Sequence, residues 1–235
     1  MGVEFGFPRI HSHALSQDRK GIAMPGAGWP ALQRPDGPLL VLASASLTRV
    51  AMLQAAGLRF DQEPAAVDEA AMKDALRAEQ VLPGDAAVAL AELKAARIAA
   101  RHGGDVIVLG ADQILTCESA WFDKPQDRAE GRAHLERLAG RRHELTTAVV
   151  AFRGGARVWH HVAAARLWIR PCSAEFLDAY LDAVGDAALS SVGAYQIEGP
   201  GAQLFARIEG DRFAILGLPL LELLKFLRLQ GVLLP

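Results

Sequence analysis

Short apolar runs alternate with segments of helical periodicity along most of this chain. Leu39–Ala43 is a continuous apolar run typical of a buried strand, and Val50, Leu53 and Ala56 then recur at helical spacing until Gly57. This order of strand, loop and helix is typical of α/β proteins.

A second strand and helix carry the first candidate for chemistry. A broad apolar face predicts a helix over 85–101, and the run Val106–Leu109 predicts a strand covered on both faces. Gly110 and Ala111 then form a small hinge that delivers Asp112 beyond the strand's carboxyl end, where α/β sheets open into binding crevices. The pattern leaves open a plain alternative, that Asp112 only caps a turn.

The second half adds antiparallel pairing. The pattern predicts a hairpin of strands 145–152 and 158–169, and helices over 128–138, 176–184 and 220–229. We therefore predict one α/β domain over 38–235, with a mixed twisted sheet flanked by helices and bilobed around a central cleft. Residues 1–37 lack periodicity and indicate a disordered tail, in which His11 and His13 are solvated.

Composition narrows the class of protein. The chain has 235 residues, 51% of them hydrophobic, and a net charge of −2, which disfavours a nucleic-acid polymer as partner. No apolar stretch is long enough for a membrane span, and no signal-peptide core is visible. The only two cysteines, Cys117 and Cys172, give neither a disulfide framework nor zinc-site spacing, so we expect a reducing cytoplasm.

The loop SASLTR combines features that bind an oxyanion. Ser44, Ser46 and Arg49 stand between a strand and the start of a helix, where free N–H groups and the helix dipole favour a phosphate. The alternative is a serine N-cap with a solvated arginine.

Other charged residues lie in less usual contexts. Glu69 ends the extended segment VDE, Lys94 interrupts the apolar helix LAELKAARIAA, and Pro125 restricts the backbone of Lys124. Ordinary interpretations are a helix-capping acid, a snorkelling lysine and a solvated turn lysine. The glycine-rich stretch 191–220 predicts a shaped binding loop or a set of tight hairpins.

Together these segments resemble the Maf family of nucleoside triphosphate pyrophosphatases. The match runs in the family's order over residues 38–230, through LASASLTR, VDE, LAELKAARIA, VIVLGADQIL, FDKPQD, LAGRRHELTTAV, GAYQIEGPGAQLF and IEGDRFAILGLPL. The resemblance implies the family's fold and hydrolysis of a nucleoside triphosphate to the monophosphate and pyrophosphate. It also implies a divalent cation, Mg²⁺ or Mn²⁺, and a cytoplasmic homodimer.

The resemblance also implies roles for individual residues. Asp112 matches the family's catalytic acid, as general base or metal ligand, and Glu69 completes the metal-binding side. Lys124 matches a position to which the resemblance assigns a catalytic role. The remaining matches hold the triphosphate: Ser44, Ser46, Arg49 and Lys94.

The positions linked to base choice are Thr48, Gln113 and Glu198. Gln113 and Glu198 resemble the 7-methyl-GTP group, since the dTTP/UTP group typically has Thr and Gln at these positions. A carboxylate such as Glu198 also accepts hydrogen bonds from the donor edge of guanine. Thr48 matches neither group, and Ser190-Ser191 departs from the charged residues of many relatives. The alternatives are a dTTP/UTP pyrophosphatase, a nucleotide-binding regulator of cell division and septum formation, and a phosphomonoesterase.

We assign structural roles to His143, His160, His161 and both cysteines, since adjacent strand histidines point to opposite faces.

Overall fold

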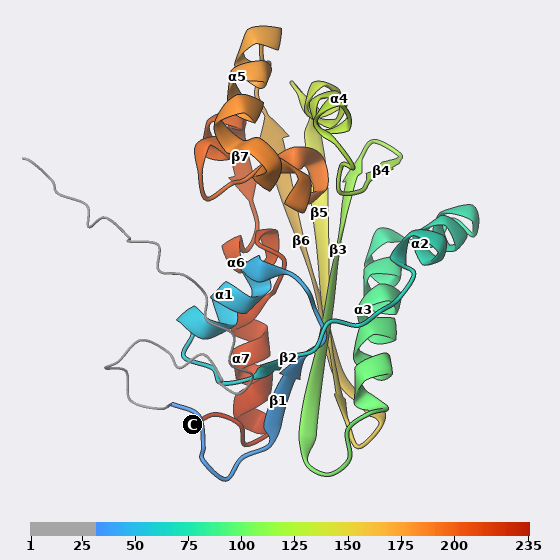
Figure 1. Ribbon diagram of the computed structural model, residues 1–235, viewed down its shortest axis with the longest axis vertical. Coiled ribbons are helices and arrows are strands. Elements are labelled where there is room, and N and C mark those ends of the chain that lie inside the picture. Colours follow the sequence, from blue (N-terminus) through green and yellow to red (C-terminus); the bar gives the residue numbers. More distant parts are fainter. Residues whose placement is uncertain (1–31) are drawn as a thin grey trace, which may run out of the picture.

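A computed structural model describes residues 32–235 of the chain (Figure 1). Its centre is a seven-stranded mixed sheet in the order β2-β1-β3-β5-β6-β7, with β4 paired to β3. The strands are β1 Leu39–Leu42, β2 Asp61–Gln62, β3 Val106–Cys117, β4 Ala120–Phe122, β5 Arg142–Arg153, β6 Ala156–Ile169 and β7 Phe205–Glu209. The predicted mixed α/β fold is confirmed.

The sheet changes direction in the middle. β1 lies parallel to both β2 and β3, whereas the pairs β3–β5, β5–β6 and β6–β7 are antiparallel. The predicted hairpin is confirmed, because β5 and β6 pair along their whole length across the turn at Gly154 and Gly155. Three long antiparallel strands therefore form a rigid centre to which the parallel edge is attached.

Helices cover both faces and one end of this sheet (Figure 1). They are α1 Leu47–Ala55, α2 Glu69–Ala78, α3 Pro83–Ala99, α4 Arg128–Leu138, α5 Ala174–Val184, α6 Arg212–Ile215 and α7 Leu220–Leu229, with 3₁₀ turns η1 Gly185–Ser190, η2 Val192–Ala194 and η3 Pro200–Leu204. The expected helices at 128–138, 176–184 and 220–229 agree with α4, α5 and α7.

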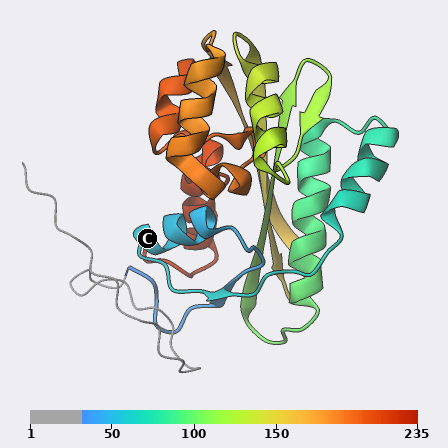
Figure 2. The same cartoon turned by 45° about the horizontal axis from the view of Figure 1, so that its top comes forward.

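The hydrophobic core has three parts, which explain the two lobes. α3 buries its alanine-rich face on one side of the sheet, and α1 and α7 cover the opposite side. α4 and α5 pack together at the end that holds the β3–β4 turn, as Figure 2 shows. The middle of β3 therefore lies where these three parts of the core meet.

The expected end of the strand at Leu109 is wrong. β3 continues to Cys117, so Asp112 stands within a strand, paired with Ala148 of β5, and no hinge delivers it. Gly110 has another physical purpose: a Cβ there would lie 2.1 Å from the carbonyl oxygen of Ala91 and 2.9 Å from the Cβ of Ala95. Glycine thus allows the backbones of β3 and α3 to approach closely.

Residues before the predicted start of the domain take part in the fold. Gln33 forms an isolated antiparallel bridge with Leu233, and its side chain exchanges hydrogen bonds with the backbone of Arg59. The ordered contacts thus begin at least five residues before position 38. Residues 1–31 of the predicted tail, with His11 and His13, lie outside the described residues. Among the described helices, none has the length and apolar character to cross a membrane.

Candidate functional site

A cavity of about 660 Å³ opens between the lobes, next to the middle of β3. The loop before α1, the helices α2 and α3, the segment after β4 and the glycine-rich stretch all contribute to its lining. The cavity brings together every residue that the sequence assigned to chemistry: Ser44, Ser46, Thr48, Arg49, Glu69, Lys94, Asp112, Gln113, Lys124 and Glu198.

The loop between β1 and α1 is ordered by its own serines. The Ser46 side chain caps α1 by accepting a hydrogen bond from the backbone N–H of Arg49, at 3.4 Å. Ser44 is buried, and its hydroxyl oxygen accepts from the backbone N–H of Ser46, at 3.2 Å. The N-cap alternative is thus correct for Ser46, and the buried Ser44 forms a hydrogen bond within its own loop.

Arg49 is buried rather than solvated. Its guanidinium donates to the carbonyl oxygen of Gly217 at 2.7 Å, to that of Ala111 at 2.9 Å and to the Ser44 hydroxyl at 3.2 Å. Burial lowers the pKa of Arg49, and the nearby carboxylates of Asp112 and Glu69 act in the opposite direction. The arginine thus joins β1, β3 and the C-terminal segment, and supplies a fixed positive charge to the cavity wall.

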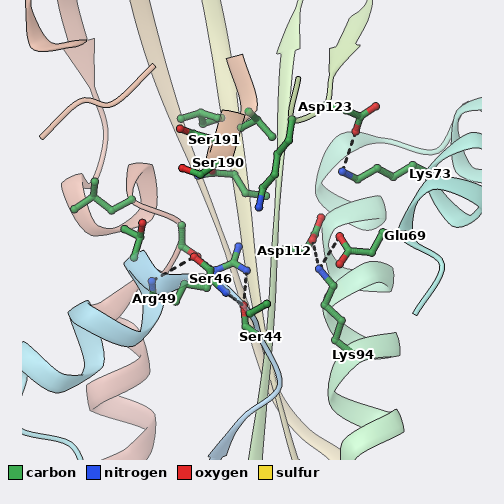
Figure 3. A pocket seen from close by; sticks show the side chains of 18 of the residues that line it. Ser44, Ser46, Arg49, Glu69, Lys73, Lys94, Asp112, Asp123, Ser190 and Ser191 are labelled. Atoms are coloured by element: carbon green, nitrogen blue, oxygen red, sulfur yellow. Dashed lines mark hydrogen bonds and ion pairs between the residues drawn. The ribbon is translucent and has the colours of Figure 1, made fainter. Parts of the chain in front are cut away.

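Asp112, Lys94 and Glu69 form a compact charged group (Figure 3). The Lys94 Nζ lies 2.6 Å from Oδ1 of Asp112 and 3.0 Å from Oε2 of Glu69. Lys94 and Asp112 are almost fully buried, with 6% and 4% of their surfaces exposed, so the lysine does not snorkel to solvent. The second oxygen of Asp112, Oδ2, is buried and has no hydrogen-bond partner among the described residues.

Lys124 adds a further cation to the lining of the cavity. It follows β4 in the segment FDKP, and its side chain is exposed to the cavity. Desolvation by the surrounding protein lowers its pKa, and the positive charges of Arg49 and Lys94 add to this effect against Glu69 and Asp112. An anion bound between these cations would relieve their mutual repulsion.

The residues assigned to base choice differ in whether their polar groups are already bound within the protein or exposed. Gln113 donates its amide N–H groups to the Thr147 hydroxyl and to the carbonyl oxygens of Ala214 and Ile215, at 2.8–3.1 Å. This side chain therefore ties β3 to α6. Thr48 and Glu198 are exposed, and Glu198 has one ionic contact, 3.6 Å from Arg212.

The glycine-rich stretch forms short 3₁₀ turns held by buried aromatic hydroxyls. Tyr180 donates to the carbonyl oxygen of Ala194 and accepts from the backbone N–H of Gln196, which fixes Ala194 at a φ of 61°. Below the turn, the hydroxyl of Tyr195 lies 3.0 Å from the ring nitrogen of His143, whose pKa burial lowers to about 4. The contact of His143 with the core agrees with its structural assignment.

Sequence reasoning did not identify one charged cluster of the cavity. Lys73 and Arg77 of α2 both form ion pairs with Asp123, the residue before Lys124. All three line the cavity. The signal that could have identified the two cations is their spacing of four residues on one helix face, with Glu69 a further four residues before them.

The donor set agrees with a hard cation that shares its ligands with a substrate. Within residues 32–235, no group of three or more His, Cys, Asp or Glu side chains could hold a metal by itself. Asp112 and Glu69 together offer carboxylate oxygens, among them the unpartnered Oδ2 of Asp112. Mg²⁺ is usually bound by one or two carboxylates plus substrate phosphates and water, so two acids fit this cation.

Comparison with known proteins shows the family of this chain. Residues 39–230 match the family model described as "Maf-like protein". The chain is 55% identical over 195 residues, 83% of its own length and 100% of the relative's, to a nucleoside triphosphate pyrophosphatase of Paramagnetospirillum magneticum. It is 50% identical over 194 residues, 83% of its own length and 97% of the relative's, to a 7-methyl-GTP pyrophosphatase of Rhizobium meliloti. The chain therefore belongs to the Maf family.

Proposed function

We propose that this protein hydrolyses a nucleoside triphosphate to the monophosphate and pyrophosphate. The observation that carries the proposal is a buried carboxylate, Asp112, whose Oδ2 has no hydrogen-bond partner within residues 32–235 and which shares one cavity with Lys94, Arg49 and Lys124. A triphosphate needs several fixed positive charges, and its hydrolysis needs a group that accepts a proton from water. The relatives named as pyrophosphatases support the same reaction.

Each residue has a part in the proposed reaction. Asp112 accepts a proton as a water oxygen attacks the α-phosphorus, and the bond between this phosphorus and the bridging oxygen breaks. Arg49, Lys94 and Lys124 offset the negative charge that develops on the departing pyrophosphate. The N–H groups at the start of α1 and the nearby serines orient the phosphate chain.

Asp112 and Glu69 would hold a divalent cation, Mg²⁺ or Mn²⁺, together with the substrate. Such a cation supplies charge neutralisation on phosphate oxygens and lowers the pKa of a bound water. Lys94 contacts both carboxylates, so it fixes their separation and balances part of their charge when the cation is absent.

For the substrate we propose 7-methyl-GTP. Glu198 lines the cavity with its carboxylate half exposed, and such a group accepts hydrogen bonds from the N1–H and N2–H₂ groups of a guanine edge. Gln113 contributes by holding α6, since its N–H groups are already bound to that element. The Rhizobium relative is named for this activity.

A nucleotide panel tests the substrate. We expect pyrophosphate release with Mg²⁺ to be fastest for 7-methyl-GTP, and Glu198→Gln to lower kcat/KM for this nucleotide by about tenfold, the effect of roughly one hydrogen bond to a charged group. The values for dTTP and UTP should change less than about twofold, as should all values in the exposed control Glu222→Gln of α7. A preference of the wild type for dTTP or UTP would overturn the substrate proposal, and orthophosphate as the product would indicate a monoesterase.

The dependence of kcat/KM on pH should reflect the ionisation of Lys124. Its pKa lies below the usual 10.5 of lysine, so the protonated form that binds phosphate is lost at a lower pH than for a free lysine. We expect kcat/KM to fall on the alkaline side, and Lys124→Arg to move this limb to higher pH because arginine stays charged. Lys225→Arg on α7, an exposed lysine, should leave the profile in place. An alkaline limb that stays in place in Lys124→Arg would show that another group titrates.

We also propose that the protein acts in the cytoplasm as a homodimer. The family resemblance supports both parts of this statement, and the low cysteine content supports the first.

A further inference from the structure

Helix α2 carries a residue of the proposed site but has little hydrophobic anchorage. Glu69 is its first residue, and Leu76 is the only buried residue of this helix. The helix lies beside α3 at the margin of the molecule, away from the centre of the sheet (Figure 1). The position of Glu69 therefore depends on the polar contacts that attach α2 to the rest of the fold.

One face of α2 carries three charged residues at intervals of one helical turn. Glu69, Lys73 and Arg77 are four residues apart, so their side chains leave the helix in the same direction. All three line the cavity. Glu69 reaches Lys94 on α3, and the other two reach toward the segment after β4.

Asp123 is the partner of both cations. Its Oδ1 lies 2.9 Å from the Lys73 Nζ and its Oδ2 accepts a hydrogen bond from Arg77, whose guanidinium also lies over the ring of Trp121, 5.4 Å from its centroid. Figure 3 shows Lys73 and Asp123 meeting above Glu69 and Lys94, on the same side of the cavity. A carboxylate that binds two residues of one helix, one with each oxygen, restrains the rotation of that helix as well as its distance from the carboxylate.

The charge state of Asp123 agrees with this arrangement. Burial alone would raise the pKa of its carboxyl, but hydrogen bonds from Arg77 and Lys73 outweigh it, and the net shift of the pKa is downward. The lowered pKa keeps this carboxyl ionised at neutral pH, so the contact persists there.

We propose that Asp123 is a positioning residue, which fixes α2 through Lys73 and Arg77 and so holds Glu69 against Lys94 at the reaction site. This inference rests on the proposed function. Asp123 is half exposed, so its ion pairs contribute little to global stability. Its effect is on the geometry of a catalytic carboxylate, and displacement by a fraction of an ångström to one ångström is enough to slow a reaction.

The test compares Asp123→Asn with Asp74→Asn. Asp74 also pairs with Arg77, at 3.0 Å, but it belongs to α2 itself and is 74% exposed, so it cannot attach the helix to anything else. We expect Asp123→Asn to lower kcat for nucleotide hydrolysis by about tenfold, with KM within about twofold. Asp74→Asn should match the wild type. Unchanged kcat in Asp123→Asn would overturn the inference.

A double-mutant cycle separates positioning from a general structural effect. If Asp123 acts through Glu69, its substitution should have no further effect on kcat in a Glu69→Gln background, because the carboxylate to be placed is gone. Additive losses would overturn the inference.

Amide hydrogen exchange gives a reading that needs no activity. Residues 69–78 should exchange about tenfold faster in Asp123→Asn than in Asp74→Asn, with the β3 amides unchanged. A wild type that releases no pyrophosphate from any nucleotide would overturn the proposed function. The difference in hydrogen exchange between the two variants would still test the positioning role. Equal exchange in the two variants would overturn the positioning role.

Discussion

Replacing Asp112 by asparagine is expected to lower kcat for pyrophosphate release by about 10³-fold, the middle of the range for a lost general base. The amide oxygen can still accept the hydrogen bond from Lys94, which now spans 2.6 Å. The amide nitrogen takes the place of Oδ2, which has no partner to lose within the described chain. KM should therefore stay within about threefold, since Arg49, Lys94 and Lys124, the side chains proposed to bind phosphate, are unchanged.

Pre-steady-state product release and nucleotide binding by calorimetry provide the measurement. The control is Glu92→Gln on the outer face of α3, a half-exposed acid paired with Arg157, which should retain full activity. Loss of nucleotide binding together with turnover would assign Asp112 to substrate binding, and retained turnover would remove it from the reaction.

Replacing Lys94 by methionine should have the largest effect on stability. It leaves the buried carboxylate of Asp112 without its partner and removes the charge that separates it from Glu69. Loss of one member of a buried ion pair typically costs 3–5 kcal/mol, and we expect about 3 kcal/mol because the cavity lets water reach the site. Urea denaturation, followed by linear extrapolation, measures the change in the free energy of unfolding.

Two further measurements identify the cause. The double variant Lys94→Met, Asp112→Asn should be more stable than Lys94→Met alone, because the unpaired charge is then absent. Added Mg²⁺ should raise the midpoint of Lys94→Met more than that of the wild type, as a cation can replace the lost ammonium. A Lys94→Met midpoint equal to that of the wild type would show that the ion pair is energetically neutral.

The site could be predicted from the sequence to the extent that its residues lie in recognisable local contexts. Ser44 and Arg49 follow the apolar strand β1, and Asp112 continues the apolar run of β3, so the pattern of hydrophobic positions places all three close to the sheet. The local pattern did not reveal that β3 continues beyond Gly110. A glycine within an apolar run is compatible with either a hinge or a close helix contact, and only the packing of α3 distinguishes them.

The cluster around Asp123 could not be predicted for a different reason. Its members are 46 and 50 residues apart in the chain and lie on a helix and a loop that pack through polar contacts. Hydrophobic periodicity carries no information about such contacts, since a charged residue on a helix surface is usually solvated. The same limit applies to Gln113, whose partners Ala214 and Ile215 are more than a hundred residues away.

The missing side chain of Gly110 sets a dimension of the reaction site. Gly110 and Asp112 are two residues apart and so face the same side of β3, toward the turn of α3 that bears Lys94. Any methyl group at 110 would push against the main chain of α3 and carry the ammonium away from its carboxylate. The absence of a side chain at position 110 therefore sets the distance between β3 and α3, and with it the distance that Lys94 must span to reach Asp112.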